Sequence, residues 1–100
     1  MIKHIVMWRL HEQANGQDKA TNAQLAKDKL EALVGQIPGL ISLEVGQDFS
    51  CGEMSADLVL YSELASKQAL TDYAVHPAHV EVVKFILSIC SERRVVDYEV

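Results

Sequence analysis

The sequence predicts an α+β domain of 100 residues in which helices cover one face of a four-stranded antiparallel sheet. Three observations lead to this fold class. Four short segments are rich in β-branched and aromatic residues, as strands are. Between them lie two regions in which apolar residues recur every three or four positions, as on one side of a helix. The segments follow the order β-α-β-β-α-β, and the length is that of one domain, taken as residues 1–100.

The first strand is predicted at residues 2–10, a β-branched and aromatic segment that ends in a polar run. One face carries Ile2, His4, Val6, Trp8 and Leu10, and the other carries Lys3, Ile5, Met7 and Arg9. Strands that are covered on one side only alternate cleanly between apolar and polar residues. Because Ile5 and Met7 break that alternation, we expect both faces of this strand to be covered.

The first helix follows a polar loop at residues 11–16 that contains an Asn-Gly turn signal. Its start lies at Asp18 or at Thr21, since Thr21 and Gln24 have the spacing of a capping box and Asp18 can cap one turn earlier. A Pro-Gly pair directly after the helical pattern prevents its continuation. The apolar stripe of this helix consists of Ala23, Ala26, Leu30, Leu33 and Ile37.

The second half of the chain contains two more strands, a helical region and a final strand. Alternating apolar residues predict strands at residues 40–45 and 57–62, joined by a polar loop at 46–55. A short helix is expected at residues 63–73 and the last strand at 92–100. This order is the ferredoxin-like, or split βαβ, arrangement with its helices on one side of the sheet.

The segment Tyr-Ala-Val-His-Pro-Ala-His, residues 73–79, divides the second helical region in two. A proline is favoured at the first position of a helix and disfavours helical backbone in the residue before it. We therefore expect His76 to cap a new helix that begins at Pro77. The apolar stripe of this helix is predicted to consist of His79, Val83, Ile86 and Cys90.

Helices on one side leave the other face of the sheet bare, and on the first strand that face is apolar through Ile5 and Met7. A bare apolar sheet face of several hundred Å² is typical of a partner interface. The simplest partner is a second copy of the chain, related by a two-fold axis. The sequence therefore predicts a homodimer.

Composition and charge argue against several other functions. The net charge is −5, from 9 basic and 14 acidic residues, and the basic residues are scattered, so nucleic acid is not an expected partner. No apolar run approaches the roughly 20 residues of a membrane-spanning helix, and the N-terminus lacks the pattern of a secretory signal. Cys51 and Cys90 are far apart, which favours a reduced cytoplasmic protein with free thiols. No phosphate-binding glycine motif or nucleophile elbow is present, so no cofactor is expected.

Three segments resemble the stress-responsive α/β-barrel (Dabb) family: the opening IKHIVMWRL, the stretch IPGLISLEVGQDFS and, most specifically, YAVHPAHV. The resemblance covers essentially the whole chain. It implies a homodimer in which two sheets close into one barrel. Some members resemble plant stress-stable proteins without established chemistry. A few resemble cofactor-free cyclases that close linear polyketides by aldol condensation.

The resemblance to the cyclases also implies site residues. Their tyrosine and histidine map to Tyr73 and His79 in this sequence, and a pocket histidine on their first strand maps to His4. At the third-strand position where a plant cyclase has a further pocket histidine, this sequence has Asp57. That departure argues against the same substrate.

His4 and Trp8 share one side of the first strand. Asp57 and Tyr61 point to the same side of the sheet if the third strand is oriented in the same way. A buried Asp57 needs a partner, and His4 on the neighbouring strand is the natural one, in a structural or a functional role. The predicted ligand pocket between sheet and helices is lined by His4, Val6, Trp8, Asp57, Val59, Tyr61 and Val83.

Tyr73 and His79 are predicted to act as an acid and a base. An imidazole with an ordinary pKa near 6.5 can take a proton from the carbon beside a carbonyl, and a phenol can donate to the developing enolate oxygen. The structural alternatives are a core histidine bonded to a backbone carbonyl and a helix-end tyrosine whose hydroxyl reaches water. A metal site built from His76, His79, His4 and Asp57 is disfavoured, because these residues form no dense cluster.

We therefore expect a small homodimeric barrel protein that binds a small apolar or carbonyl ligand between its sheet and its helices. The alternative is a cofactor-free enzyme, such as an aldol cyclase or a monooxygenase, with His79 as base and Tyr73 as acid. Neither function requires a metal.

Overall fold

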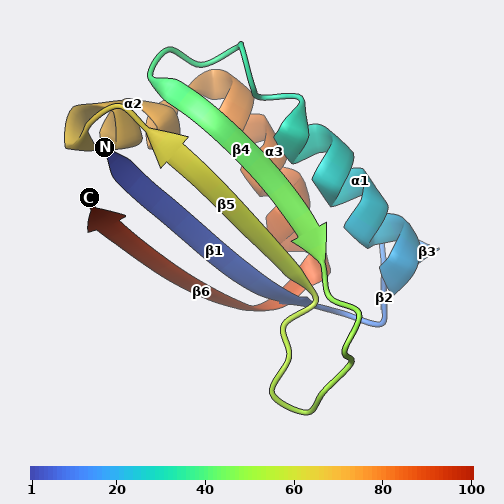
Figure 1. Ribbon diagram of the computed structural model, residues 1–100. Helices are drawn as coiled ribbons and strands as arrows, with labels where there is room; N and C mark the ends of the chain where they lie inside the picture. Colours follow the sequence, from blue (N-terminus) through green and yellow to red (C-terminus); the bar gives the residue numbers. More distant parts are fainter.

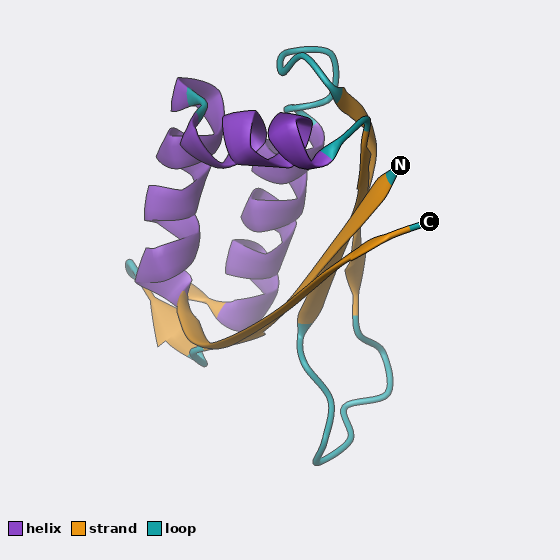
Figure 2. Cartoon of the chain, turned by 90° about the vertical axis from the view of Figure 1, so that its left-hand side faces the viewer, coloured by secondary structure: helices purple, strands orange, loops and turns teal.

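Four strands form one antiparallel sheet, and three helices lie on one of its faces (Figures 1 and 2). The computed structural model describes residues 1–100. In spatial order the strands are β4 (Leu40–Gln47), β5 (Leu58–Leu64), β1 (Ile2–Leu10) and β6 (Cys90–Glu99). The helices are α1 (Lys19–Glu31), α2 (Lys67–Val75) and α3 (Pro77–Ile89). The predicted ferredoxin-like α+β fold is therefore confirmed.

Element boundaries differ from the predicted ones where local capping decides them. Asp18 rather than Thr21 caps α1, since its carboxylate accepts a hydrogen bond of 2.8 Å from the backbone N–H of Thr21. Helix α2 starts at Lys67, later than predicted, because β5 is longer and Ser66 caps the helix. Cys90, predicted as the end of the stripe on α3, has extended backbone and instead begins β6.

A short hairpin of β2 (Gln13–Ala14) and β3 (Gln17–Asp18) interrupts the predicted polar loop after β1. It turns at Asn15 and Gly16, whose φ angles are 55° and 75°. Left-handed backbone at both positions is what a tight hairpin turn of this kind requires, and Asn-Gly adopts it readily. The predicted turn is confirmed, although the two short strands beside it were not expected.

The helix-facing side of the sheet forms the core. Pairing of β1 with β5 sets Val6 opposite Leu60 and His4 opposite Ser62, so these four side chains point toward the helices. All four are buried. The complete set of buried β1 residues is Ile2, His4, Val6, Trp8 and Leu10, which the sequence places on one face of the strand.

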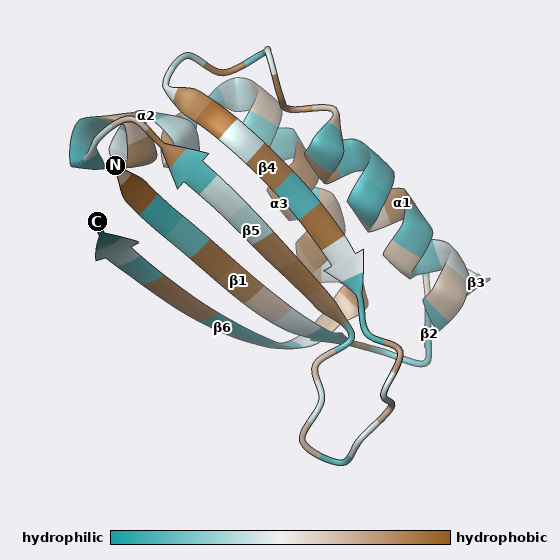
Figure 3. Cartoon of the chain, in the orientation of Figure 1, coloured by the Kyte–Doolittle hydropathy of each residue, from teal (hydrophilic) through white to brown (hydrophobic).

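The opposite face of the sheet carries no helix and is partly apolar (Figures 2 and 3). On this face Ile5 of β1 lies between Tyr61 of β5 and Val96 of β6. Met7 lies opposite Val59 and is 46% exposed. An apolar band that crosses three strands is therefore uncovered in the single chain, in agreement with the two apolar faces predicted for the first strand.

Val59 and Tyr61 lie on this uncovered face, so their predicted place in a pocket under the helices is wrong. The pairing of β1 with β5 sets Leu60 rather than Val59 beside Val6. A shift of one residue in register moves a side chain to the other face of a sheet. Because residues 57–64 have apolar residues at both odd and even positions, their pattern alone does not define the buried face.

The junction of α2 and α3 is fixed by His76 and Pro77, as predicted. His76 has extended backbone, and its Nδ1 accepts a hydrogen bond of 3.1 Å from the N–H of Ala78. Pro77 is the first residue of α3, a position where the missing N–H would have had no partner within the helix.

Replacing His76 with Ala should lower the free energy of unfolding by about 1 kcal/mol, because the helix loses its capping acceptor. Urea denaturation of the purified variant measures this change. His11→Ala is a matched control, since His11 is exposed in the loop after β1. Equal destabilisation by the two substitutions would show that His76 does not act as a cap.

Candidate functional site

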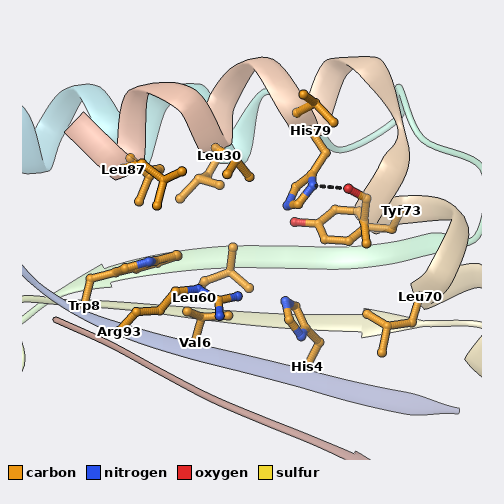
Figure 4. A pocket seen from close by; sticks show the side chains of 14 residues that line it. His4, Val6, Trp8, Leu30, Leu60, Leu70, Tyr73, His79, Leu87 and Arg93 are labelled. Carbon is orange, nitrogen blue, oxygen red and sulfur yellow. Dashed lines mark hydrogen bonds between the residues drawn. The ribbon is translucent and has the colours of Figure 1, made fainter. Parts of the chain in front are cut away.

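A cavity of about 370 Å³ lies between the helix-facing side of the sheet and the helices (Figure 4). Its wall is mostly apolar, because 11 of its 14 lining residues are hydrophobic. Three large exposed residues of the lining, Val80, Leu87 and Arg93, belong to α3 and β6, so the cavity opens between these elements. The lining residues are His4, Val6, Trp8, Leu30, Leu60, Leu70, Tyr73, Ala74, His79, Val80, Val83, Ile86, Leu87 and Arg93.

The break between α2 and α3 brings Tyr73 and His79 together. Their ring centroids are 4.2 Å apart, although the two residues belong to different helices. Tyr73 is 1% exposed, and its hydroxyl has no hydrogen-bond partner within the chain. Burial raises the pKa of Tyr73 to about 12, so the phenol stays protonated and can donate a hydrogen bond at neutral pH.

His79 uses one ring nitrogen and leaves the other free. Its Nδ1 lies 3.1 Å from the carbonyl oxygen of Ala74 and must donate to it, because a carbonyl only accepts. The Nε2 of the neutral ring therefore carries a lone pair, and Figure 4 shows this ring beside the Tyr73 hydroxyl. Burial lowers the pKa of His79 below its ordinary 6.5, more than the Ala74 carbonyl raises it, so the ring is neutral at pH 7. The imidazole thus bonds to a backbone carbonyl and also faces the cavity.

His4 is oriented by Asp97, not by Asp57. The Nδ1 of His4 hydrogen-bonds to the carboxylate of Asp97, which lies directly opposite on β6. The Asp57 carboxylate instead accepts a bond of 2.7 Å from the N–H of Leu10 and lies 3.5 Å from the ammonium of Lys19. The predicted pair of His4 with Asp57 is therefore wrong, because β1 has a second neighbouring strand that supplies the acid.

Six of the predicted site residues line the cavity, namely His4, Val6, Trp8, Tyr73, His79 and Val83. The ring centroid of His4 lies 5.9 Å from that of Tyr73, so the two histidines flank the phenol. Asp57, Val59 and Tyr61 are not part of the lining. Sequence reasoning missed eight of the 14 lining residues, among them Leu60 and Arg93. Arg93 precedes Asp97 by four residues, an even spacing that puts both side chains on the same side of the last strand. That side faces the cavity, so the spacing could have indicated Arg93 once the place of Asp97 was known.

The two histidines of the His-Pro-Ala-His segment do not act together. The ring of His76 caps α3, whereas the ring of His79 bonds to Ala74 and faces the cavity. No group of three or more His, Cys, Asp or Glu side chains converges as the ligands of a metal ion do. None of the helices combines the length and the apolar character that crossing a membrane requires.

The sequence model of the stress responsive A/B barrel domain matches residues 2–100. The chain belongs to the Dabb family. A dimeric protein of ferredoxin-like fold from Bacteroides fragilis is 32% identical to this Dabb chain, with a TM-score of 0.88 over 99% of this chain and 95% of that one.

Two further proteins similar to this Dabb chain differ in what they show. A stress-response A/B barrel domain-containing protein from Arabidopsis thaliana is 28% identical over 107 residues, which cover 98% of this chain and 46% of the relative. The Dabb chain therefore spans about half the length of this curated relative. A hydroxynitrile lyase from Passiflora edulis has a TM-score of 0.81 over 97% of this chain and 90% of that one. At 17% identity the lyase shows a shared fold alone.

Proposed function

We propose that this Dabb chain forms a homodimer and binds a small, largely apolar carbonyl compound between its sheet and its helices. One observation supports this most strongly: the hydroxyl of Tyr73 is buried without a partner beside the free Nε2 of His79. An unpaired buried polar group costs about 1–3 kcal/mol. A ligand oxygen that accepts from Tyr73 removes this cost, and a carbonyl supplies such an oxygen.

The rest of the cavity favours an apolar ligand of modest size. Its volume of about 370 Å³ lies near the lower end of the range for small-molecule sites. Leu60, Val83 and Ile86 contribute to a wall that offers no hydrogen bonds to most of the ligand surface. Polar groups are concentrated instead around the phenol of Tyr73 and near the opening. A ligand with one carbonyl on an apolar frame matches this distribution.

The homodimer is supported by the uncovered face of the sheet. Ile5, Tyr61 and Val96 lie side by side on three strands with no helix above them. The related ferredoxin-like proteins from Bacteroides fragilis, Thermobifida fusca and Jannaschia are dimeric. A stable interface on this face would bury on the order of 1,200–2,000 Å² in total.

A cofactor-free enzyme is the second candidate, and the state of His79 favours it. The free Nε2 of a neutral imidazole can take a proton from the carbon beside the bound carbonyl. Tyr73 would then donate to the oxygen on which negative charge develops. His4, held by Asp97, stands on the other side of the phenol. An aldol cyclase and a cofactor-free monooxygenase both use such a proton abstraction.

The Tyr73→Phe variant tests ligand binding and stability together. We expect the wild-type protein to bind the uncharged ketone butyrophenone, and the variant to bind it roughly 2–10-fold more weakly, because one hydrogen bond is lost. The same variant should be more stable without ligand by on the order of 1 kcal/mol, since an unpaired buried hydroxyl is removed. Titration calorimetry and urea denaturation measure the two effects.

Tyr98→Phe is the matched control, because Tyr98 is 43% exposed on the uncovered face of the sheet. It should leave butyrophenone binding unchanged. Absence of butyrophenone binding to the wild-type protein would contradict the proposed ligand class. Unchanged binding to Tyr73→Phe would remove the phenol from the site.

A further inference from the structure

Trp8 and Arg93 form a second polar region of the cavity, apart from Tyr73 and His79. They lie directly opposite each other on β1 and β6, so their side chains leave the sheet on the same side. Both line the cavity. Trp8 is 5% exposed, and its indole Nε1–H is buried without a hydrogen-bond partner. An indole nitrogen is a donor only, so this atom requires an acceptor that the chain does not supply.

Arg93 carries a positive charge that no acidic side chain balances. The ion pairs of the chain leave Arg93 out, and none of the residues that line the cavity is acidic. The nearest acid on the same side of β6 is Asp97, which is occupied by His4. The positive charge of Arg93 also contributes to the lowered pKa of His79, which places the Arg93 guanidinium within electrostatic reach of that ring. In a chain of net charge −5, this cavity has a positive and donor-rich end.

We propose that the ligand carries a carboxylate, which binds the guanidinium of Arg93 and the indole Nε1–H of Trp8 while its carbonyl binds Tyr73. This inference rests on the proposed function and narrows the ligand class to small apolar oxo acids. A guanidinium matches the two oxygens of a carboxylate with parallel hydrogen bonds. A phosphate would bring more oxygens and more charge than these two side chains can satisfy. Arg93 is exposed at the edge strand, so the carboxylate lies at the opening and the apolar part lies inside.

The spacing along the sheet separates the two polar groups of the ligand. His4 marks the Tyr73 end of the cavity, because the two ring centroids are 5.9 Å apart. Trp8 follows His4 by four positions on β1, which is about 13 Å at the usual rise per residue. Figure 4 shows the side chain of Arg93 between Trp8 and His4 in the cavity. The carbonyl and the carboxylate are therefore separated by intervening carbons rather than adjacent.

A matched pair of probes tests the carboxylate. Benzoylpropionate has a ketone, an apolar ring and a separated carboxylate, and benzoylpropanamide replaces the carboxylate with an uncharged amide. We expect wild-type protein to bind the acid at least about 10-fold more tightly than the amide in titration calorimetry. Arg93→Gln should weaken binding of the acid by roughly 10–100-fold and bring the two probes to similar affinity.

Two more variants identify the donors. Arg93→Lys keeps the charge but loses the parallel geometry, so its loss of acid binding should be intermediate. Trp8→Phe keeps an aromatic wall without the N–H and should also reduce the preference for the acid. Lys84→Gln removes one positive charge outside the cavity, on the exposed side of α3, and should leave the preference as it is in the wild type.

The outcomes separate this inference from the proposed function. Equal affinity of the wild-type protein for acid and amide would overturn the carboxylate site while leaving ketone binding in place. An acid preference that persists in Arg93→Gln would do the same. Failure of both probes to bind would contradict the proposed ligand cavity and the carboxylate site with it.

Discussion

Replacing His79 with Ala should slow the exchange of protons beside the carbonyl of bound butyrophenone by about 10²–10⁴-fold. In the wild type, His79 donates from Nδ1 to the carbonyl oxygen of Ala74, so the lone pair on its Nε2 is free to take a proton. An alanine side chain at position 79 has no such lone pair. Exchange in deuterated water is measured by NMR from loss of the proton signal, and it needs no knowledge of the physiological reaction. The variant should still be a folded protein that binds the ketone.

The pH dependence of this exchange identifies the base. Because burial lowers the pKa of His79 below 6.5, the neutral ring persists to lower pH than an exposed histidine would allow. The rate should therefore fall as the pH drops through that lowered pKa, with a midpoint below 6.5. His11→Ala is the control, since His11 is exposed in the loop after β1 and does not contribute to the pKa shift of His79, so this variant should keep the rate and its profile. Exchange in His79→Ala at the wild-type rate would exclude His79 as the base and leave a binding protein.

The fold could be predicted because each element has its own local signal. The first strand is rich in β-branched and aromatic residues, and all five residues that the sequence places on the face of His4 are buried. The break before α3 follows from what proline does to the backbone at and before its own position. These effects act over a few residues, so they can be read from a short stretch of chain.

The candidate site could be predicted only where it lies next to such a signal. Tyr73 and His79 flank the helix break, and the break alone brings their rings together. The partner of His4 depends instead on which strands lie beside β1 and in what register. Because β1 is central, His4 has a neighbour on each side, and the acid came from β6 rather than from the segment before β5. Pairing across the sheet is long-range information that one strand does not contain.

The unpaired donors of Trp8 and Tyr73 are a further feature that sequence alone does not reveal. Each residue has an apolar body that packs in the core and a polar atom that needs a partner. A core selected for stability alone would accept Phe at both positions. Retaining two unpaired donors in one cavity is a local cost in stability, and such costs are typical of binding sites.

Replacing Val59 with Asp should convert the proposed homodimer to a monomer at micromolar concentration. Val59 lies on the uncovered face, with Met7 and Gly46 directly opposite it on the neighbouring strands. A carboxylate there would lose its hydration in the interface, and neither Met7 nor Gly46 could pair with it. We expect the dissociation constant to rise by at least about 100-fold, which corresponds to roughly 3 kcal/mol. Sedimentation velocity over a range of concentrations measures the change.

Two other acid substitutions make this prediction specific to the interface. Met7→Asp should weaken the dimer less than Val59→Asp does, because Arg94 lies directly opposite Met7 and can pair with the new carboxylate. Val34→Asp should have no effect on assembly. Val34 is 46% exposed, as Met7 is, but it lies after α1 and away from the uncovered face of the sheet. A wild-type monomer at micromolar concentration, or equal dissociation by all three substitutions, would show that the bare sheet face is not the interface. In the first case a different partner would have to cover Ile5 and Val96.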